Sequence, residues 1–429
     1  MLLFKKKKFL IYGFGLSGKS CFNFLNKNNY IDIYDDNTKL ISKKFKKYII
    51  SKKILNQSKY DYIIISPGIN INNCSINQFL KKNKSKIINE LDVFYCNYLN
   101  NFKITITGTN GKSTTAKLLY DIMKKARRDV RLVGNIGYPI LNEKNIKTNT
   151  IFIIEASSYQ IDYSKYFKTD YAIILNLSPD HLERHITFLN YAKVKFKLIK
   201  NQNKNGYAFI NKNEQILINM IKKLKTKPKI FKVNINANKN IVNKIKNNYF
   251  KNYNNLSNLT FAIEVLSKLK IKIKTSTILQ VVNSFKGLKY RQEIISDKKD
   301  ILIINDSKST SFSSSINLLK SYRNIYWILG GTIKLGDKFK LEKKYFPNIK
   351  SYIYGKDKLI FSKILKSKIK SKYFLNLKKA LLALKSDIRK DNNKKTIIFS
   401  PAAASFDQFK NFEHRGKYFN LLTKKLNLI

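Results

Sequence analysis

The sequence predicts an α/β protein of three consecutive domains, and three observations lead to this fold class. Short β-branched and aromatic runs alternate with longer amphipathic stretches, as in parallel sheets with crossover helices. The pattern starts again near residues 91 and 288, and 429 residues are long for one domain. We expect a Rossmann-like domain over 1–90, a central P-loop ATPase-like parallel sheet over 91–287 and a second Rossmann-like domain over 288–429.

The N-terminal domain is predicted from three strand candidates separated by segments long enough for helices. They are KFLIYG ending at Gly13, IDIYD ending at Asp35 and YDYIIIS ending at Ser66. The sequence GFGLSGKS at residues 13–20 fits both the P-loop pattern G-x-x-x-x-G-K-[ST] and the dinucleotide fingerprint G-x-G-x-x-G. Asp35 then stands close to the position of a ribose-binding acid.

The central domain is predicted from a second start at KITIT, residues 103–107, which runs into GTNGKST and a helix through about Ala126. Further strand candidates are RLVG (131–134), IFIIEA (151–156) and YAIILNLS (171–178). Each ends in polar residues, as expected where the carboxyl ends of parallel strands face a crevice. An amphipathic helix is expected near 255–269.

The C-terminal domain is predicted from a third series of apolar strands. These are ILIIND (301–306), IYWILGG (325–331), SYIYG (351–355) and TIIFSP (396–401). They repeat the alternation of strand and helix seen in the first domain, and so predict a third α/β unit.

The formal net charge of +57 suggests nucleic-acid binding, because Lys and Arg neutralise phosphates. Only eight of the 84 basic residues are Arg, which base-edge recognition prefers, and the Lys are spread along the chain among Asn and Ile. We therefore favour codon bias in an AT-rich genome as the origin of the charge and expect no specific nucleic-acid partner. A basic nucleic-acid-binding protein stays open as an alternative.

The three Cys and three His are too few and too dispersed for a disulfide framework or a zinc site. A bound cation would need mainly oxygen ligands, which favours Mg²⁺. The chain has no run of 18 apolar residues, and its N-terminus places an apolar MLLF before a Lys run, the reverse of a secretory signal. We expect a cytoplasmic protein without a membrane partner.

The tripeptide Gly-Lys-Ser occurs twice, at residues 18–20 and 111–113, and the two copies compete for a nucleoside triphosphate. The second copy has Ile106 where the P-loop pattern places its first Gly. Magnesium needs further oxygen ligands at neighbouring strand ends, however, and Glu155 and His181 follow strands after this copy. We therefore assign ATP to residues 108–114, while an NAD-dependent oxidoreductase built on residues 1–90 stays open.

Several motifs lie in a fixed order from Gly13 to Gly416. They are GTNGKST, GNIG (134–137), EASSYQ (155–160), SPDHLERH (178–185), YAKVK (191–195), NDSKST (305–310), LGG with Lys334, and SPAAASFDQFKNFEHRG (400–416). With these motifs the chain resembles the Mur ligases of peptidoglycan synthesis. GTNGKS alone is shared with folylpolyglutamate synthases, whereas the C-terminal segment is typical of the member that adds D-glutamate. A Mur-type ligase for a different amino acid stays open.

The resemblance implies an ATP-dependent amide synthesis. ATP would phosphorylate the alanyl carboxylate of a uridine-diphosphate-linked muramoyl substrate, and the amine of D-glutamate would attack the acyl phosphate. It also implies ATP and two Mg²⁺ ions as cofactors, and small molecules as partners. We expect a monomer whose C-terminal domain closes on the central one during turnover.

The resemblance also implies site residues. For ATP they are Gly108, Thr109, Asn110, Gly111, Lys112, Ser113, Thr114, Thr115, Asn255, Arg291 and Asp306. For the metal ions they are Ser113, Glu155, His181 and Lys195, with Lys195 as the family's carbamylated lysine, chosen over Lys193 and Lys197 by its spacing from Tyr191. The catalytic residues implied are Lys112, His181, Lys195 and Lys308.

Two further groups of residues are implied for the other substrates. For the uridine-linked substrate they are Gly15, Leu16, Ser17, Asp35, Asp36, Ser66, Asn135, Ser157 and Gln160. For D-glutamate they are Lys308, Thr310, Lys334, Ser405 and the backbone near Phe412. Ser157 could instead cap a helix, and Asn135 could stabilise a turn. The chain departs from the family pattern at Asn254 and Tyr290, which replace His.

Overall fold

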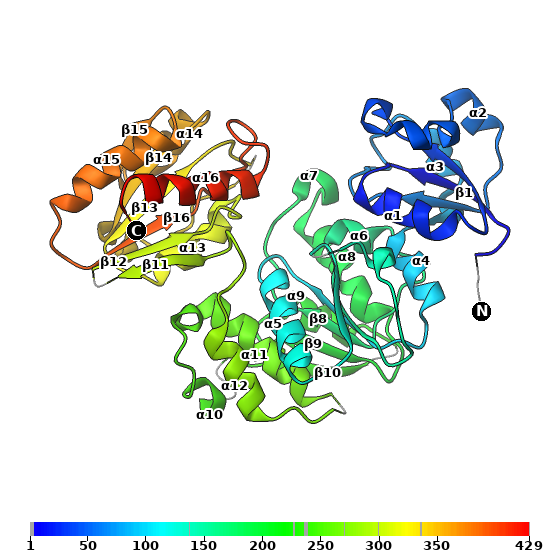
Figure 1. Cartoon of the computed structure of the whole chain (residues 1–429), viewed down its shortest axis with the longest axis horizontal. Helices are drawn as coiled ribbons and strands as arrows, with labels where there is room; N and C mark the ends of the chain where they lie inside the picture. Colours follow the sequence, from blue (N-terminus) through cyan, green and yellow to red (C-terminus); the bar gives the residue numbers. More distant parts are fainter. Residues whose placement is uncertain are drawn as a thin grey trace. The chain divides into compact units, whose positions relative to one another are not determined.

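The computed structural model describes residues 4–136, 138–225, 228–235, 239–269, 271–298, 300–334 and 337–428. Gly137, the last residue of the GNIG motif, lies outside them. The described strands form three sheets, one of four strands and two of six, with helices between them in the chain (Figure 1). The predicted α/β fold class is therefore confirmed.

Two compact units are distinguished by their internal contacts. Unit 1 comprises residues 1–244 and 258–281, and holds the first two sheets. Unit 2 comprises residues 245–257 and 282–429, and holds the third sheet. The division into three domains at residues 90/91 and 287/288 stays a prediction.

The first sheet is parallel, with the strand order β2-β1-β3-β4. Its strands are β1 (Lys8–Tyr12), β2 (Tyr30–Tyr34), β3 (Tyr62–Ile65) and β4 (Ile87–Ile88). The helices of this part are α1 (Leu16–Leu25), α2 (Lys52–Gln57), α3 (Asn77–Lys82) and α4 (Glu90–Asn97). The three predicted strands are confirmed, and β4 is an addition of two residues.

The second sheet is also parallel, with the order β10-β9-β8-β5-β7-β6. Its strands are β5 (Lys103–Thr107), β6 (Val130–Gly134), β7 (Ile151–Glu155), β8 (Tyr171–Ile174), β9 (Tyr207–Asn211) and β10 (Lys229–Val233). The helices that follow β5 are α5 (Lys112–Lys125), α6 (Ser158–Asp162), α7 (Leu182–His185), α8 (Phe188–Lys200), α9 (Gln215–Lys222), α10 (Lys239–Val242), α11 (Tyr253–Ser267) and α12 (Thr275–Ser284). β5 and β7 are buried along their whole length, as expected of central parallel strands.

The third sheet is mixed, with the order β11-β12-β16-β13-β14-β15, and β11 is its one antiparallel strand. Its strands are β11 (Glu293–Lys298), β12 (Ile301–Asn305), β13 (Ile325–Gly330), β14 (Ile349–Tyr354), β15 (Lys370–Phe374) and β16 (Lys395–Phe399). The helices are α13 (Phe312–Lys320), α14 (Lys358–Leu365), α15 (Leu377–Arg389) and α16 (Phe412–Lys425). No helix in the described part of the chain has the length and apolarity needed to span a membrane.

Few lysines enter the interior of this lysine-rich chain. Among the described residues, Lys103, Lys195 and Lys395 are the buried ones. Lys103 Nζ donates to the carbonyl oxygen of Leu99 at 3.1 Å, and Lys395 Nζ donates to that of Ile388 at 3.3 Å. Burial lowers the pKa of Lys103 to about 8. An interior lysine in this fold is therefore anchored by backbone carbonyls, as a buried ammonium group requires.

The carboxylate of Asp92 fastens α4 to the segment between α6 and β8. Asp92 is fully buried, and it closes a capping box with Asn89 at the start of α4. Its oxygens also accept hydrogen bonds from the backbone N–H groups of Lys165 at 2.9 Å, Tyr166 at 2.7 Å and Phe167 at 2.9 Å. One acid therefore satisfies several buried donors, which hold together two parts of unit 1.

We predict that Asp92→Asn lowers the free energy of unfolding by about 3 kcal/mol, because the amide offers one acceptor oxygen and leaves buried N–H groups unsatisfied. The measurement is urea-induced unfolding followed by circular dichroism. The matched control is Asp121→Asn, which removes a partly exposed ion pair with Lys117 and should cost less than about 0.5 kcal/mol. Equal losses for the two variants would contradict this account of Asp92.

Candidate functional site

A glycine-rich loop joins β5 to α5 and contains the second Gly-Lys-Ser. Gly108 and Gly111 have φ angles of +149° and +85°, which side-chain-bearing residues rarely adopt. A Cβ at Gly111 would lie 2.1 Å from Oδ1 of Asn258 on α11, so the loop also depends on the absence of a side chain there. The first N–H groups of α5 begin directly after this turn, which is the arrangement that binds phosphates in P-loop proteins.

The loop is held in place by the residues that follow β8. Thr109 Oγ1 accepts a hydrogen bond from the backbone N–H of Ser178 at 3.0 Å. The side chain of Asn176 pairs with the backbone of Asn110, accepting from its N–H at 2.9 Å and donating to its carbonyl at 3.1 Å. Lys112 Nζ donates to the carbonyl oxygens of Gly108 at 2.9 Å and Thr109 at 2.8 Å.

Glu155 is a predicted site residue that contacts two others, Ser113 and Asn135. It is the last residue of β7 and is 1% exposed. Its Oε2 accepts a hydrogen bond from Ser113 Oγ at 2.6 Å, and its Oε1 accepts one from Asn135 Nδ2 at 2.7 Å. Because β5, β7 and β6 are neighbours in a parallel sheet, their carboxyl ends place these oxygen-rich side chains beside the loop.

Lys195 is the buried lysine of the YAKVKFK stretch on α8. Its exposure is 1%, whereas Lys193 is exposed and Lys197 is partly exposed. Its Nζ donates to the carbonyl of Gly108 at 2.9 Å and lies 4.7 Å from the centre of the Tyr191 ring. Burial, and then the charge of Lys112, lower the pKa of Lys195 well below its usual value. Burial and a neighbouring cation therefore both oppose the charged form of this amine.

His181 lies at the N-terminus of α7 with a φ angle of +55°. Its Nδ1 is 2.9 Å from the hydroxyl of Tyr159 on α6 and 3.3 Å from Oε1 of Glu183. Its Nε2 is 3.5 Å from Oδ2 of Asp180. The negative charge of Asp180 also raises the pKa of Lys195, although burial outweighs it. The structure thus places one more acid near Lys195 than the sequence predicts.

Ser157 and Gln160 form a capping box at the start of α6 (Ser158–Asp162). Ser157 Oγ accepts from the backbone N–H of Gln160 at 3.3 Å, and the backbone N–H of Ser157 donates to Oε1 of Gln160 at 3.0 Å. The helix-cap interpretation of Ser157 is therefore confirmed. Contact of these two residues with a substrate stays a prediction.

The acids predicted beside the first glycine-rich loop, which joins β1 to α1, follow β2 and bind groups of the protein itself. Asp35 Oδ2 accepts from the backbone N–H of Phe14 at 2.6 Å, and Asp36 Oδ2 accepts from the hydroxyl of Tyr12 at 2.6 Å. Ser66 Oγ donates to the carbonyl of Gly13 at 2.6 Å. The remaining predicted residues of this loop differ in environment: a Cβ added at Gly15 would meet nothing within 4 Å, Leu16 is 79% exposed and Ser17 is half-buried.

In unit 2, Asp306 lies at the end of β12 among buried polar groups. Its carboxylate accepts from the backbone N–H of Gln292 at 3.1 Å and from Ser400 Oγ at 2.9 Å. Burial raises the pKa of Asp306 to about 7, although these bonds and the charge of Arg291 oppose the shift. Asn255 is buried and donates to the carbonyl of Tyr249 at 3.0 Å.

The residues predicted to bind D-glutamate lie on separate segments of unit 2, and these segments contact one another in two pairs. Lys308 Nζ lies 4.0 Å from the centre of the Phe412 ring. Thr332 and Ala404 exchange backbone hydrogen bonds at 2.9 and 2.8 Å, which links the segment of Lys334 to that of Ser405. Thr310 is partly exposed.

Arg415, to which the sequence analysis gives no role, lies beside the segment of the predicted residues Asp306 and Lys308. It is fully buried, and its Nε and Nη2 donate to Oγ and O of Ser307 at 3.1 and 2.7 Å. The signal was present, because Arg415 belongs to the quoted C-terminal motif. The position of Asn258 against Gly111 was also missed, because the sequence does not show which helix packs on the loop.

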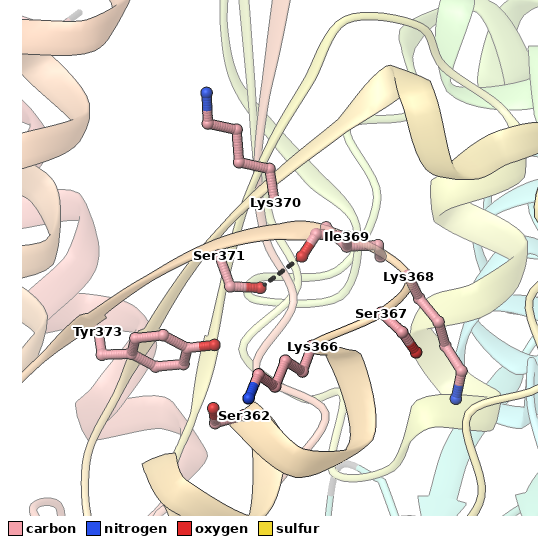
Figure 2. Close-up of a pocket in the computed structure, with 8 residues that line it drawn as sticks. All are labelled: Ser362, Lys366, Ser367, Lys368, Ile369, Lys370, Ser371 and Tyr373. Atoms are coloured by element: carbon pink, nitrogen blue, oxygen red, sulfur yellow. Dashed lines mark hydrogen bonds between the residues drawn. The ribbon is translucent and has the colours of Figure 1, made fainter.

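A separate cavity of about 600 Å³ lies at the β15 edge of the third sheet (Figure 2). It is lined by Ser362, Lys366, Ser367, Lys368, Ile369, Lys370, Ser371 and Tyr373. Figure 2 shows the amines of its three lysines spread apart rather than converging on one point. None of the predicted site residues lines it. Among the described residues no group of three or more His, Cys, Asp and Glu side chains could hold a metal ion.

Comparisons with known proteins give a family and a fold. The family model of the Mur ligase middle domain matches residues 106–285. A UDP-N-acetylmuramoylalanine–D-glutamate ligase of Rickettsia bellii is 32% identical over 453 residues, which cover 100% of both chains. The enzyme of that name from Francisella tularensis subsp. novicida is 33% identical over 98% of this chain and 97% of its own.

Solved structures are similar at lower identity. The MurF ligase of Thermotoga maritima in complex with ADP has a TM-score of 0.58 at 14% identity and covers 100% of this chain and 97% of its own. MurF of Acinetobacter baumannii has a TM-score of 0.59 at 15% identity over 78% of this chain and 79% of its own. These likenesses concern the fold.

We predict that Gly111→Ala destabilises the chain by about 1–2 kcal/mol through its left-handed φ angle alone, with an added cost from displacing Asn258. Nucleotide affinity should fall at least tenfold, because the N–H groups at the start of α5 would shift. Thermal unfolding and equilibrium binding of a fluorescent ATP analogue measure the two effects. Gly68→Ala is the control, since its Cβ meets nothing within 4 Å; identical behaviour of both variants would refute the prediction.

Proposed function

The chain belongs to the Mur ligase family, and from this premise we propose how its residues divide the work of the reaction. It is an ATP-dependent ligase that adds D-glutamate to UDP-N-acetylmuramoyl-L-alanine in peptidoglycan precursor synthesis. The observation that carries this function is the full-length similarity to ligases of that name. Cell-wall formation, and with it cell shape and division, depends on such precursors.

We propose two chemical steps. A carboxylate oxygen of the alanyl group attacks the γ-phosphorus of ATP, and the bond to the leaving ADP breaks. The amine of D-glutamate then attacks the acyl carbon, phosphate leaves with the bonding electrons, and the amine loses a proton. Because an anion attacks an anion in the first step, charge neutralisation and orientation should dominate the catalysis, without a protein nucleophile.

The loop at residues 108–114 is proposed to hold the triphosphate. Support comes from its position at the N-terminus of α5 and from the amine of Lys112, which already lies among the loop carbonyls. A bound phosphate would compete for that amine and for the N–H groups of the first helical turn. Asn255, Arg291 and Asp306 are proposed to contact ATP on the family resemblance.

The donor set beside this loop fits Mg²⁺. Ser113 Oγ and Glu155 Oε2 are buried oxygen donors 2.6 Å apart, and hard oxygen ligands are what Mg²⁺ prefers. We propose that these two residues hold one ion and that His181 and Lys195 hold a second. Bound Mg²⁺ would supply charge neutralisation to the phosphates. Few protein carboxylates are needed, because phosphate oxygens and water complete such a shell.

Lys195 is proposed to be carbamylated. The neutral amine is the form that adds CO₂, and burial favours that form here. The product is a carbamate anion, formed with loss of a proton from the amine. In its buried position, an anion would be stabilised by Lys112 and by the second metal ion.

The first glycine-rich loop is proposed to bind the uridine diphosphate group. Gly15 and the N-terminus of α1 leave room for phosphates, and the nearby predicted residues are Leu16, Ser17, Asp35, Asp36 and Ser66. Asn135, Ser157 and Gln160 are proposed to contact the muramoyl-alanine part. D-glutamate is a dianion, and Lys308, Thr310, Lys334, Ser405 and the backbone at Phe412 offer it cations, hydroxyls and N–H groups.

We further propose that the enzyme acts in the cytoplasm as a monomer. The three domains would then be a UDP-substrate domain at 1–90, an ATP domain at 91–287 and an amino-acid domain at 288–429. The separate sheets of the structure support this division, because each sheet has its own set of helices.

We predict that phosphate release from ATP requires UDP-N-acetylmuramoyl-L-alanine and is stimulated by D-glutamate. L-glutamate, lysine and diaminopimelate should give less than about a tenth of that stimulation, because buried polar groups shaped for one substrate reject a misfitting one. The measurement is a coupled phosphate assay with each amino acid in turn. An equal response to L-glutamate or to lysine would show that the amino-acid assignment is wrong.

We predict opposite results for the lysines of the two Gly-Lys-Ser copies. Lys112→Ala should lower kcat/KM at least about a hundredfold, because it removes a charge from the phosphate site. Lys19→Ala should stay within about threefold of the unmodified enzyme, since Lys19 is partly exposed in a chain rich in lysine. Steady-state kinetics with ATP varied measures both. A larger loss for Lys19→Ala would reverse the assignment of the two loops.

A further inference from the structure

The hydroxyl of Tyr163, the residue that follows α6, joins two segments that lie far apart in the sequence. It donates its proton to the carbonyl oxygen of Ile69 at 3.0 Å and accepts a hydrogen bond from the backbone N–H of Ile71 at 3.0 Å. It also accepts a hydrogen bond from Nη2 of Arg184 on α7. A phenol oxygen has one proton to donate and can accept two, so these three bonds use its whole hydrogen-bonding capacity.

The guanidinium of Arg184 packs against two aromatic rings. It lies 4.9 Å from the centre of the Tyr163 ring and 5.3 Å from the centre of the Tyr159 ring on α6. The backbone N–H of Arg184 donates to the carbonyl oxygen of His181 at 3.0 Å, in the first turn of α7 (α6 and α7 are labelled in Figure 1). Attraction to both rings restricts the rotation of the cation. Arg184 therefore connects Tyr163 to the turn that carries His181.

The segment after β3, which Tyr163 binds, contacts the first glycine-rich loop. Ser66 Oγ donates to the carbonyl of Gly13 at 2.6 Å, and the backbone N–H of Ile69 donates to the carbonyl of Ser66 at 3.0 Å. A Cβ added at Gly13 would lie 3.2 Å from Cγ1 of Ile69. The carbonyl that Tyr163 binds therefore belongs to a residue packed directly against the first loop.

In the proposed function, one substrate has to reach both ends of this connection. Its uridine diphosphate group binds at the first glycine-rich loop, and its alanyl carboxylate reacts beside the second loop and His181. The separation of these two places decides whether a substrate anchored at one end presents its carboxylate to ATP at the other. Misplacement of a reacting group by about 1 Å can lower a rate about a hundredfold.

We propose that Tyr163 and Arg184 are positioning residues that fix the distance between the first glycine-rich loop and the turn of His181, and so align the alanyl carboxylate for phosphorylation. The family resemblance assigns no role to either residue. The effect on the reaction rests on the proposed function, whereas the link between the two segments rests on the hydrogen bonds of Tyr163.

Two variants of the full-length chain test the effect on the reaction. Tyr163→Phe removes the hydroxyl and keeps the ring, and Arg184→Met removes the guanidinium. Each should lower kcat/KM for the uridine-linked substrate about tenfold, because the carboxylate is misplaced. The KM for ATP and the dissociation constant of UDP, measured by calorimetry, should change less than about twofold, because the first loop keeps its own contacts with Ser66.

The double variant and two controls sharpen this test. Since the two residues act through one contact, the double variant should stay within about twofold of the more damaged single variant. The controls are Tyr30→Phe and Arg128→Met, because both side chains are exposed. Losses that multiply in the double variant, or a UDP affinity that falls as far as kcat/KM, would overturn the proposal.

Hydrogen–deuterium exchange without substrates tests the link itself. Arg184 reaches the segment after β3 through Tyr163, so Arg184→Met should speed amide exchange in residues 67–72 at least about threefold, and Arg128→Met should not. Unchanged exchange in that segment would overturn the proposal. An unmodified chain that releases no phosphate with its substrates would contradict the proposed function, and faster exchange in Arg184→Met would then still support the link.

Discussion

The carboxylate of Glu155 is the interaction on which the central site depends. Glu155 is the last residue of a fully buried strand, and both of its carboxylate oxygens accept hydrogen bonds. The donors are Ser113 at the start of α5 and Asn135 after β6. This is possible because a parallel sheet places the ends of adjacent strands on one edge. The glycine-rich loop, the helix behind it and the loop after β6 are thus aligned by one acid, which gathers the oxygen donors of the proposed metal site.

The carbonyl of Gly108 links this arrangement to the rest of the site. Lys112 and Lys195, from different helices, both donate to it at 2.9 Å. Because the two amines share one acceptor, a positive charge on one raises the free energy of charging the other. The pKa of Lys195 is lowered by this repulsion and, more strongly, by its burial. One backbone carbonyl therefore brings together the amines of the two lysines that we propose for phosphate binding and for carbamylation.

The sequence was sufficient for most strands and for the order of the motifs, and insufficient for β9, for several edge strands and for partners. β7 and β13 are almost continuous apolar runs because they are buried on both faces. β10 and β15 were not predicted, since KIFKV and KSKYF interleave lysine on exposed edge strands. The closeness of Tyr159 to His181 and of Asn258 to Gly111 arises only once helices pack, and no local pattern contains it.

The burial of lysine gives this composition a further meaning. A lysine whose side chain reaches water costs the fold little, so a compositional drift towards lysine meets little resistance at the surface. An interior position accepts lysine only where the buried amine has carbonyl acceptors. Lys103, Lys195 and Lys395 each have them. In other proteins of similar composition, the buried lysines would therefore be the ones to examine for a structural or functional role. A count of all lysines would not identify them.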